Sequence, residues 1–125
     1  MTTKNVGDAG EAQALAHLLG QGLTLVERNY RVARGPNARG GEVDLILREP
    51  DGTLVFVEVR TRRSASHGGA AASVGTIKQR RLVLAAQHFL QRFKTLPACR
   101  FDVVTIEGPG VPARIEWLRA AFDTS

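Results

Sequence analysis

The chain has 125 residues, of which 43% are hydrophobic and 23% charged, with a formal net charge of +5 and a pI near 10.3. This composition is ordinary for a soluble globular protein and predicts one domain over residues 1–125; a membrane-spanning class is excluded because no apolar run approaches the length of a membrane helix. An N-terminus without the apolar core of a signal peptide favours a cytoplasmic location, and a single cysteine, Cys99, excludes an internal disulfide and a cysteine-based zinc site.

The positive charge has two interpretations. Three of the 17 basic residues are lysines and the other 14 are arginines, in a chain that is also rich in alanine, as a genome that favours Arg and Ala codons would produce. The alternative is a polyanionic partner. The gathering of basic residues within 60–63 and within 78–81 favours that alternative.

Two elements precede the first charged motif. Residues 8–20 predict a helix with an apolar stripe, and residues 23–33 predict a strand because apolar and polar residues alternate along part of it. The glycine-rich segment 34–41 follows and carries Arg39. Its glycines match no phosphate-binding fingerprint, so we expect a loop that leads the chain into the next strand.

Glu11 occupies an unusual position on the predicted helix. It lies four residues before Leu15 and seven before Leu18, so it shares their inward apolar face. One interpretation is a first-turn carboxylate that the helix dipole stabilises. The other is a third carboxylate in a metal site that acids elsewhere in the chain would form.

The most informative segment is 40–62, which predicts two strands joined by a tight turn. Pro50 suits the first corner of a type I turn, and Gly52 suits the left-handed residue that follows the turn. This turn closes with Glu49 opposite Thr53. The turn chemistry therefore predicts the register of the whole hairpin.

In that register Asp44 and Glu58 are cross-strand neighbours, with Cβ atoms roughly 4.5–5.5 Å apart. Val43, Leu45 and Leu47 point to the other face, and a slip of one residue would separate the two carboxylates. Like charges so placed are destabilising, and a bare carboxylate pair in a half-buried sheet is costly. A hard divalent cation with oxygen ligands fits between them.

Residues 76–93 predict the longest helix, with a core stripe that includes Leu82 and Phe89. Lys78 and Arg81 form a basic edge near its start. This edge is interpreted either as a solvated helix face or as an edge that contacts phosphates.

Residues 100–107 and 113–118 predict the last two strands. Asp102 alternates with apolar neighbours, and we expect it at a strand end on the surface. The order of helix, three strands, helix and two strands predicts an α/β fold in which helices flank a mixed sheet.

These motifs together resemble a known family. The segments GDAGEAQA, GGEVDLI, LVFVEVRTR and RFDVV, with the helix that carries Lys78 and Arg81, are similar to the small uncharacterised YraN-like proteins. Those proteins in turn resemble the PD-(D/E)xK nuclease superfamily, which includes archaeal Holliday-junction resolvases. The resemblance covers roughly residues 7–122 and implies a restriction-endonuclease-like fold with a mixed five-stranded sheet.

The resemblance also implies roles for single residues. Asp44 and Glu58 correspond to the Mg²⁺ ligands of the superfamily, with the carbonyl of Val59 as a third oxygen. Glu11 corresponds to the N-terminal helical glutamate of the resolvase branch. Arg60 stands where the superfamily has a lysine; arginine binds phosphate well, but it stays charged and does not readily accept a proton.

The sequence therefore predicts a nuclease-like protein, a Mg²⁺- or Mn²⁺-dependent endonuclease in its fullest form, that binds DNA by structure rather than base sequence. Branched or junction DNA is among the expected substrates, and the oligomeric state stays open, with a homodimer as one alternative. The expected phosphate contacts are Arg39, Arg62, Arg63, Lys78 and Arg81. The alternative function is a non-catalytic nucleic-acid-binding or partner-docking module, in which Arg60 pairs with Asp44 or Glu58 and no metal binds.

Overall fold

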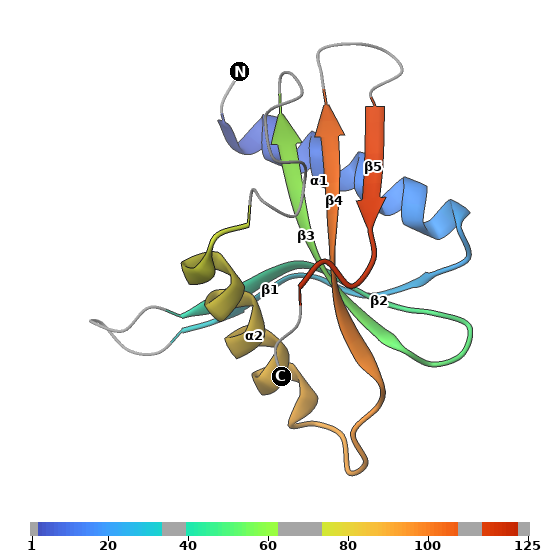
Figure 1. Ribbon diagram of the computed structural model, residues 1–125, viewed down its shortest axis with the longest axis vertical. Coiled ribbons are helices and arrows are strands. Elements are labelled where there is room, and N and C mark those ends of the chain that lie inside the picture. Colours follow the sequence, from blue (N-terminus) through green and yellow to red (C-terminus); the bar gives the residue numbers. More distant parts are fainter. Residues whose placement is uncertain (1–2, 34–39, 63–73, 108–113, 123–125) are drawn as a thin grey trace.

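The computed structural model describes residues 3–33, 40–62, 74–107 and 114–122. The elements follow the predicted order: α1 (Thr3–Gly20), β1 (Thr24–Val32), β2 (Gly41–Arg48), β3 (Leu54–Arg62), α2 (Thr76–Leu90), β4 (Cys99–Glu107) and β5 (Arg114–Leu118) (Figure 1). The strands form one sheet in the order β1-β2-β3-β4-β5. Neighbouring strands are antiparallel except for the parallel pair β3 and β4, so the predicted mixed five-stranded α/β fold is confirmed.

The two helices differ from their predicted lengths at one end each. Helix α1 begins at Thr3, before the predicted start at residue 8, and α2 ends at Leu90, before the predicted end at residue 93. The predicted end of α1 at Gly20 is confirmed. Gly22 follows with a φ of 101°, and the amide of Leu23 donates to the carbonyl of Leu18 at 3.2 Å, which satisfies one of the carbonyls exposed at a helix C-terminus.

The turn between β2 and β3 has the predicted geometry. Gly52 has a φ of 95°, which glycine adopts without steric cost, and its amide donates to the carbonyl of Glu49 at 2.9 Å. The amide of Glu49 donates to the carbonyl of Thr53 at 2.9 Å, so these two residues close the loop. The register that follows places Leu45 opposite Val57, as the turn chemistry predicts.

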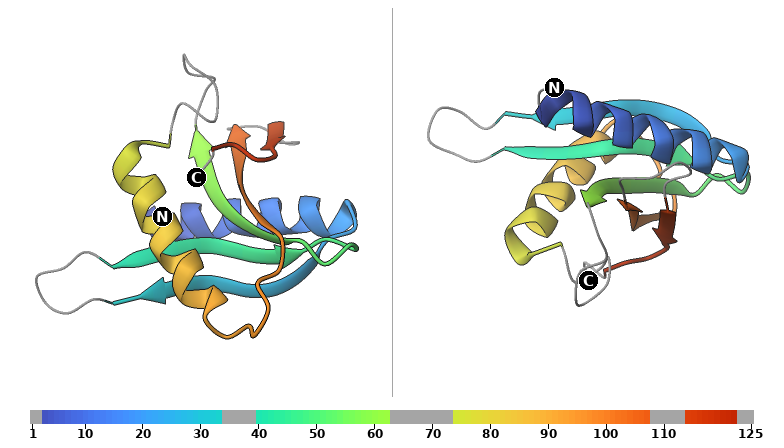
Figure 2. Two further views of the ribbon diagram at one scale, coloured as in Figure 1. Left: turned by 60° about the horizontal axis from the view of Figure 1, so that its bottom comes forward. Right: turned by 90° about the horizontal axis from the view of Figure 1, so that it is seen from above.

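The sheet is a central layer with one helix on each face (Figure 2). Helix α1 buries Ala14 and Leu18 in a cluster with Leu45 and Val57 of the sheet. Helix α2 buries its own apolar stripe in a second cluster on the other face, which contains Leu82, Ala85, Ala86 and Phe89 together with Ile46, Leu54 and Phe56. Because the sheet is covered on both faces, its central strands are apolar on both sides.

The sheet is strongly twisted. In Figure 1, β1 and β2 run across the view, whereas the upper halves of β3 and β4 run up it and β5 runs down it. Helix α2 covers β1 and β2 and approaches them closely. A Cβ at Gly41 would lie 2.5 Å from the carbonyl oxygen of Arg81, so only glycine permits this approach. The middle of α2 is thereby held against the start of β2.

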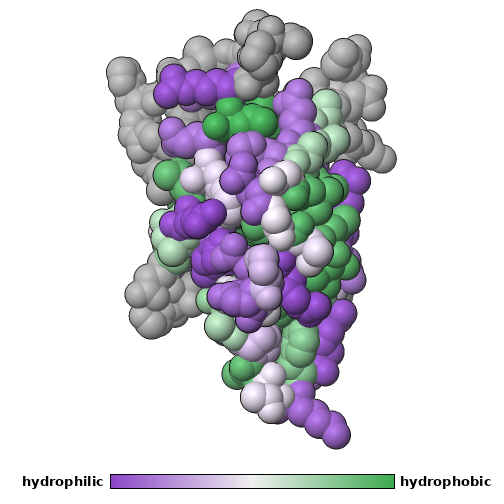
Figure 3. Space-filling model, turned by 90° about the vertical axis from the view of Figure 1, so that its right-hand side faces the viewer, coloured by the Kyte–Doolittle hydropathy of each residue, from purple (hydrophilic) through white to green (hydrophobic). Residues whose placement is uncertain are grey.

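The surface mixes hydrophilic and hydrophobic residues, as Figure 3 shows for one side. Four large apolar side chains of the described residues are exposed: Leu19, Leu25, Ile77 and Leu96. Within the described part of the chain, no helix has both the length and the apolar character needed to cross a membrane.

Candidate functional site

Asp44 lies at the point where β2 and β3 stop pairing and separate, which is the fork of the sheet. The pairing of β2 with β3 extends from Arg48 opposite Leu54 to Leu45 opposite Val57. Beyond that pair, a side chain takes the place of the main-chain partner, because Oδ2 of Asp44 accepts a hydrogen bond from the amide of Val59 at 2.8 Å. The carboxylate thus holds β3 to β2 at the fork.

The strand on the other side of Asp44 is also distorted. The β1–β2 register places Arg28 opposite Leu45 and Tyr30 opposite Val43, so Asn29 falls opposite Asp44. Asn29 has a φ of 52°, which is left-handed and which Asn tolerates better than most residues. Such distortions in strands gather beside functional sites, where they redirect a side chain.

The predicted alternation along β2 also breaks at Asp44. The sequence predicts Val43, Leu45 and Leu47 on one face of the sheet. Leu45 and Leu47 pack in the cluster beneath α1, but Val43 packs in the cluster beneath α2, so this prediction is wrong for Val43. The side chains of β2 therefore change faces at Asp44. A side chain at such a position points between the two strands rather than onto either face of the sheet.

Glu58 is the most buried acid of the fork, with 3% of its surface exposed. Its Oε1 is buried and has no hydrogen-bond partner among the described residues. Burial and the neighbouring Asp44 carboxylate raise the pKa of Glu58 to about 8, against the opposing charges of Lys78 and Arg60. Asp44 and Glu58 therefore interact as the sequence predicts, and one of them is a buried acid with an unsatisfied oxygen.

Two cations approach Glu58 from different elements. Nη1 of Arg60, two residues further along β3, lies 3.6 Å from Oε2 of Glu58. Nζ of Lys78, in the first turn of α2, lies 3.5 Å from the same oxygen. The sequence predicts a phosphate-contacting or solvated helix edge for Lys78. The structure instead brings Lys78 into a carboxylate cluster that consists of Glu42, Asp44 and Glu58.

Glu42 is a second acid that Lys78 contacts, and sequence reasoning missed it. It receives a hydrogen bond from Nζ of Lys78 at 3.2 Å, and Nη2 of Arg81 and Nε of Arg31 lie 3.5 and 3.7 Å from its carboxylate. Burial acts to raise the pKa of Glu42, but the Lys78 hydrogen bond and the three positive charges outweigh it and hold the pKa below its usual value. The available signal was its position two residues before Asp44 on the same strand.

Glu11 contacts the site from α1, through Asn29 of β1. The side-chain amide of Asn29, oriented with its nitrogen toward Glu11, donates to the two carboxylate oxygens at 3.1 and 3.3 Å. Glu11 therefore contacts the distorted residue of β1 opposite Asp44. Its role as a third metal ligand stays a prediction, because no three His, Cys, Asp or Glu side chains meet as a metal-binding group in the part of the chain that the structure describes.

Several predicted residues are placed only in part or not at all. Arg39 and Arg63 lie outside the described residues, as does most of the glycine-rich segment 34–41. Arg62 is the last residue of β3. Val59, whose carbonyl is the third expected metal ligand, lies between Glu58 and Arg60 on β3, and its amide donates to Asp44.

These donors suit a hard cation. Asp44, Glu58 and the carbonyl of Val59 offer only oxygen atoms, which Mg²⁺ and Mn²⁺ prefer. The buried, unsatisfied Oε1 of Glu58 is an acceptor that such a cation would satisfy. With Lys78 and Arg60 on the rim, the same arrangement also has the charges that bind a phosphate.

Asp102 is not the surface residue that the sequence predicts. It is 1% exposed, and its carboxylate accepts hydrogen bonds from Nε of Arg100, Nε1 of Trp117 at 2.9 Å and the amide of Ala120 at 2.9 Å. These bonds join β4 to β5 and to the turn that follows it. Because its acceptors are satisfied by this network, Asp102 is a structural residue.

Comparison with known proteins gives a consistent match. The family described as "Uncharacterised protein family UPF0102" matches residues 10–106. A UPF0102 protein of Methylibium petroleiphilum is 66% identical over 125 residues, which cover 100% of this chain and 99% of that protein. A UPF0102 protein of Polaromonas naphthalenivorans is 57% identical over 130 residues, which cover 100% of this chain and 83% of that protein. A third, from Acidovorax sp., is 59% identical over 124 residues, or 99% of this chain and 89% of that protein.

Proposed function

The chain belongs to the uncharacterised protein family UPF0102, and from that premise we propose that it is a metal-dependent, nuclease-like protein that binds DNA and hydrolyses its phosphodiester bonds. One observation carries the proposal. A buried carboxylate with an unsatisfied oxygen, Glu58, faces Asp44 at the fork of the sheet, and two cations border the pair. Acids that bind a metal and cations that bind a phosphate are the two components that phosphodiester hydrolysis needs.

In this proposal Asp44, Glu58 and the carbonyl of Val59 hold Mg²⁺ or Mn²⁺. The metal, when bound, polarises the phosphate and lowers the pKa of a water ligand. The protein contributes a fixed site: the amide of Val59 orients the Asp44 carboxylate at 2.8 Å, and burial keeps bulk water away from Glu58. Glu11, which contacts Asn29 opposite Asp44, supports the site from the α1 side.

Arg60 and Lys78 bind the phosphate that is to be cut. Arg60 presents a guanidinium that matches two phosphate oxygens, and its side chain is 37% exposed, so the group is accessible to a large substrate. The superfamily's lysine is missing at position 60. The ammonium of Lys78 lies 3.5 Å from the same Glu58 oxygen, so a lysine is supplied to this site from α2.

We expect further basic residues to bind DNA beyond the cut phosphate. Arg81 of α2 lies 3.5 Å from Glu42 and Arg62 ends β3, whereas Arg39 and Arg63 are predicted contacts outside the described residues. Contacts of this kind neutralise phosphates without reading bases, so DNA would be selected by its structure. Branched and junction forms are the first substrates to test.

A second candidate function is a non-catalytic DNA-binding or partner-docking module. The observation that favours it is the same pair of cations. Arg60 and Lys78 lie 3.6 and 3.5 Å from Glu58, and Lys78 also bonds Glu42, so the chain's own side chains already offset part of the acidic charge. In this alternative the cluster is a set of ion pairs that joins β2, β3 and α2.

A cleavage assay separates the two candidates. End-labelled linear, flapped and four-way DNA of equal length would be incubated with Mg²⁺, with Mn²⁺ and with a chelator. The proposal expects metal-dependent cutting that Asp44→Asn abolishes. Calorimetric titration of the protein with the metals, without DNA, is the second arm. No metal binding at all would overturn the metal site and favour the binding module, whereas metal binding without cutting of any DNA form would overturn the proposed hydrolysis.

A further inference from the structure

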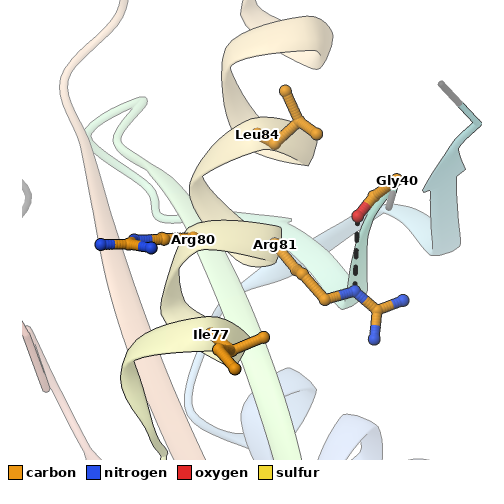
Figure 4. A pocket seen from close by; sticks show the side chains of 5 residues that line it. All are labelled: Gly40, Ile77, Arg80, Arg81 and Leu84. Carbon is orange, nitrogen blue, oxygen red and sulfur yellow. Dashed lines mark hydrogen bonds between the residues drawn. The ribbon is translucent and has the colours of Figure 1, made fainter. Parts of the chain in front are cut away.

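A pocket lies on α2 beside the carboxylate cluster (Figure 4). Its lining consists of Gly40, Ile77, Arg80, Arg81 and Leu84. Its volume is about 250 Å³, which is below the about 300–1,000 Å³ typical of pockets for drug-sized molecules. The pocket therefore suits a small group that belongs to a larger ligand.

The apolar part of the lining comes from one side of α2. Ile77 and Leu84 are two helical turns apart, so they project from the same side of the helix. Ile77 is 59% exposed, so its apolar side chain is accessible to a ligand in the pocket. Leu84 is half-buried. A flat apolar group that rested on these two side chains would remove both from water.

The charged part of the lining is entirely basic. Arg80 and Arg81 point to opposite sides of the helix in Figure 4, with Arg81 turned toward Gly40. Nε of Arg81 donates to the carbonyl of Gly40 at 3.3 Å, and its Nη2 lies 3.5 Å from Glu42. The Arg81 guanidinium therefore belongs both to the pocket and to the carboxylate cluster. No acidic residue is among the described residues that line the pocket.

We propose that the pocket holds an unpaired nucleobase of the DNA whose phosphate lies at the carboxylate cluster. This inference rests on the proposed function and specifies its substrate class. A ligand for this site needs an anionic part for the arginines and a flat apolar part for Ile77 and Leu84, and a nucleotide has both. Arginine also stacks on bases.

The base must be unpaired. A paired base is stacked inside the duplex, and its removal costs a few kcal/mol, whereas a base in a flap, a gap or a junction is already free. The pocket thus explains how a protein without base-reading elements would prefer DNA of one structure. The substrate class is DNA with an unpaired nucleotide next to the phosphate at the cluster.

The test measures binding in chelator, so that no DNA is cut. Three fluorescent DNAs of equal length would be compared by anisotropy: a full duplex, the same duplex with one unpaired nucleotide, and that DNA with an abasic residue in place of the unpaired nucleotide. The inference expects the unpaired nucleotide to tighten binding and the abasic residue to remove the gain, since the abasic residue keeps the phosphate and lacks the base.

Two variants identify the pocket as the cause. Ile77→Ala should weaken binding of the DNA with the unpaired nucleotide at least about 4-fold, the equivalent of one methylene group no longer buried, and leave duplex binding unchanged. Leu96→Ala is the matched control, because Leu96 is 70% exposed and lies outside the pocket. Thermal melting of both variants checks that each is folded.

The outcomes separate this inference from the function on which it rests. If DNA is bound but the abasic and base-containing forms bind alike, or if Ile77→Ala behaves like Leu96→Ala, the pocket inference is overturned and the proposed function stands. If no DNA form is bound at all, the proposed function fails and the pocket inference fails with it.

Discussion

Lys78 of α2 and Glu58 of β3 meet at the fork of the sheet, with Nζ of the lysine 3.5 Å from Oε2 of the acid. The same ammonium donates to Glu42 of β2 at 3.2 Å. One side chain therefore joins three elements at the place where β2 and β3 separate. Whatever neutralises Glu58 decides what the site can do.

The first prediction concerns the metal. Mg²⁺ or Mn²⁺ should raise the melting temperature of the protein, since a ligand that binds only the folded state stabilises it. Asp44→Asn should remove most of that increment. Asparagine loses the charge but keeps an oxygen that accepts from the Val59 amide, so the fold is retained. Glu116→Gln, at an exposed acid of β5, is the control and should respond to metal like the wild type. An unchanged response in Asp44→Asn would contradict the assignment.

The second prediction concerns pH. The pKa of Glu58 is raised from 4.5 to about 8, so between these values the folded protein keeps a proton that the unfolded chain releases. The stability contributed by this group is complete below about pH 4.5 and is lost as the pH rises through about 8, with a slope of up to about 1.4 kcal/mol per pH unit. Glu58→Gln should lack this slope.

Urea unfolding from pH 5 to 9, in chelator, tests this prediction by comparing the free energies of unfolding of the wild type and Glu58→Gln. The lowered pKa of Glu42 acts below its usual value of 4.5 and so outside this range. Parallel curves for the two proteins would show that Glu58 does not titrate as its burial implies.

The third prediction concerns Lys78. In chelator at pH 8, Lys78→Met should lower the free energy of unfolding by roughly 1–2 kcal/mol, because Glu58 and Glu42 lose a charged hydrogen-bonding partner. Arg80→Met, two residues along the helix and exposed, should change it by less than about 0.5 kcal/mol. Saturating Mg²⁺ should restore part of the loss in Lys78→Met. If chemical denaturation gave the same change in the free energy of unfolding for both substitutions, Lys78 would not stabilise the cluster.

The fourth prediction concerns DNA affinity. Binding should weaken steeply from low to physiological salt and should be similar for all base sequences, because it depends on phosphate contacts. The double variant Arg62→Glu, Arg63→Glu should bind DNA of every base sequence more weakly and to the same extent. It should also reduce the slope of log affinity against log salt by about 1 for each phosphate that is no longer neutralised. The control is the double variant Arg48→Glu, Arg119→Glu, at two exposed arginines that are not among the expected phosphate contacts. Salt-independent binding, or strong preference for one sequence, would count against this prediction.

The fifth prediction concerns Arg60. Arg60→Lys should increase the rate of DNA cutting with little change in affinity, because lysine restores the group that the superfamily places there. Arg60→Ala should lose both cutting and affinity, since the guanidinium beside Glu58 that binds the cut phosphate is then gone. Single-turnover assays on each DNA form, with Asp44→Asn as the inactive reference, measure the two quantities separately. If Arg60→Lys cuts no DNA form with either metal, the binding-module alternative gains.

Local chemistry was sufficient to predict the hairpin. Pro50 and Gly52 fix the turn through their own backbone preferences, and the turn fixes the register, so the approach of Asp44 to Glu58 follows from a few adjacent residues. The element order, the mixed sheet and the apolar stripe of α2 likewise follow from patterns within short segments.

The tertiary structure decided everything that depends on how separate elements meet. Where the β2–β3 ladder ends is set by the twist of the whole sheet, so the sideways presentation of Asp44 and the change of face at Val43 are not visible in the alternation of the strand. The orientation of α2 is set by the packing of its apolar stripe and by the close approach at Gly41.

That packing turned Lys78 toward Glu42 and Glu58 rather than toward solvent, because a charged residue at the flank of a helix stripe can point either way until the helix is docked. The partners of Asp102 were likewise set by packing between separate elements. Its partners, among them Trp117 and the amide of Ala120, come from β5 and the turn beyond it, so alternation within β4 predicted a surface residue where the fold made a buried one. Short-range patterns determine register and periodicity, whereas the partners of a charged side chain are determined by long-range packing.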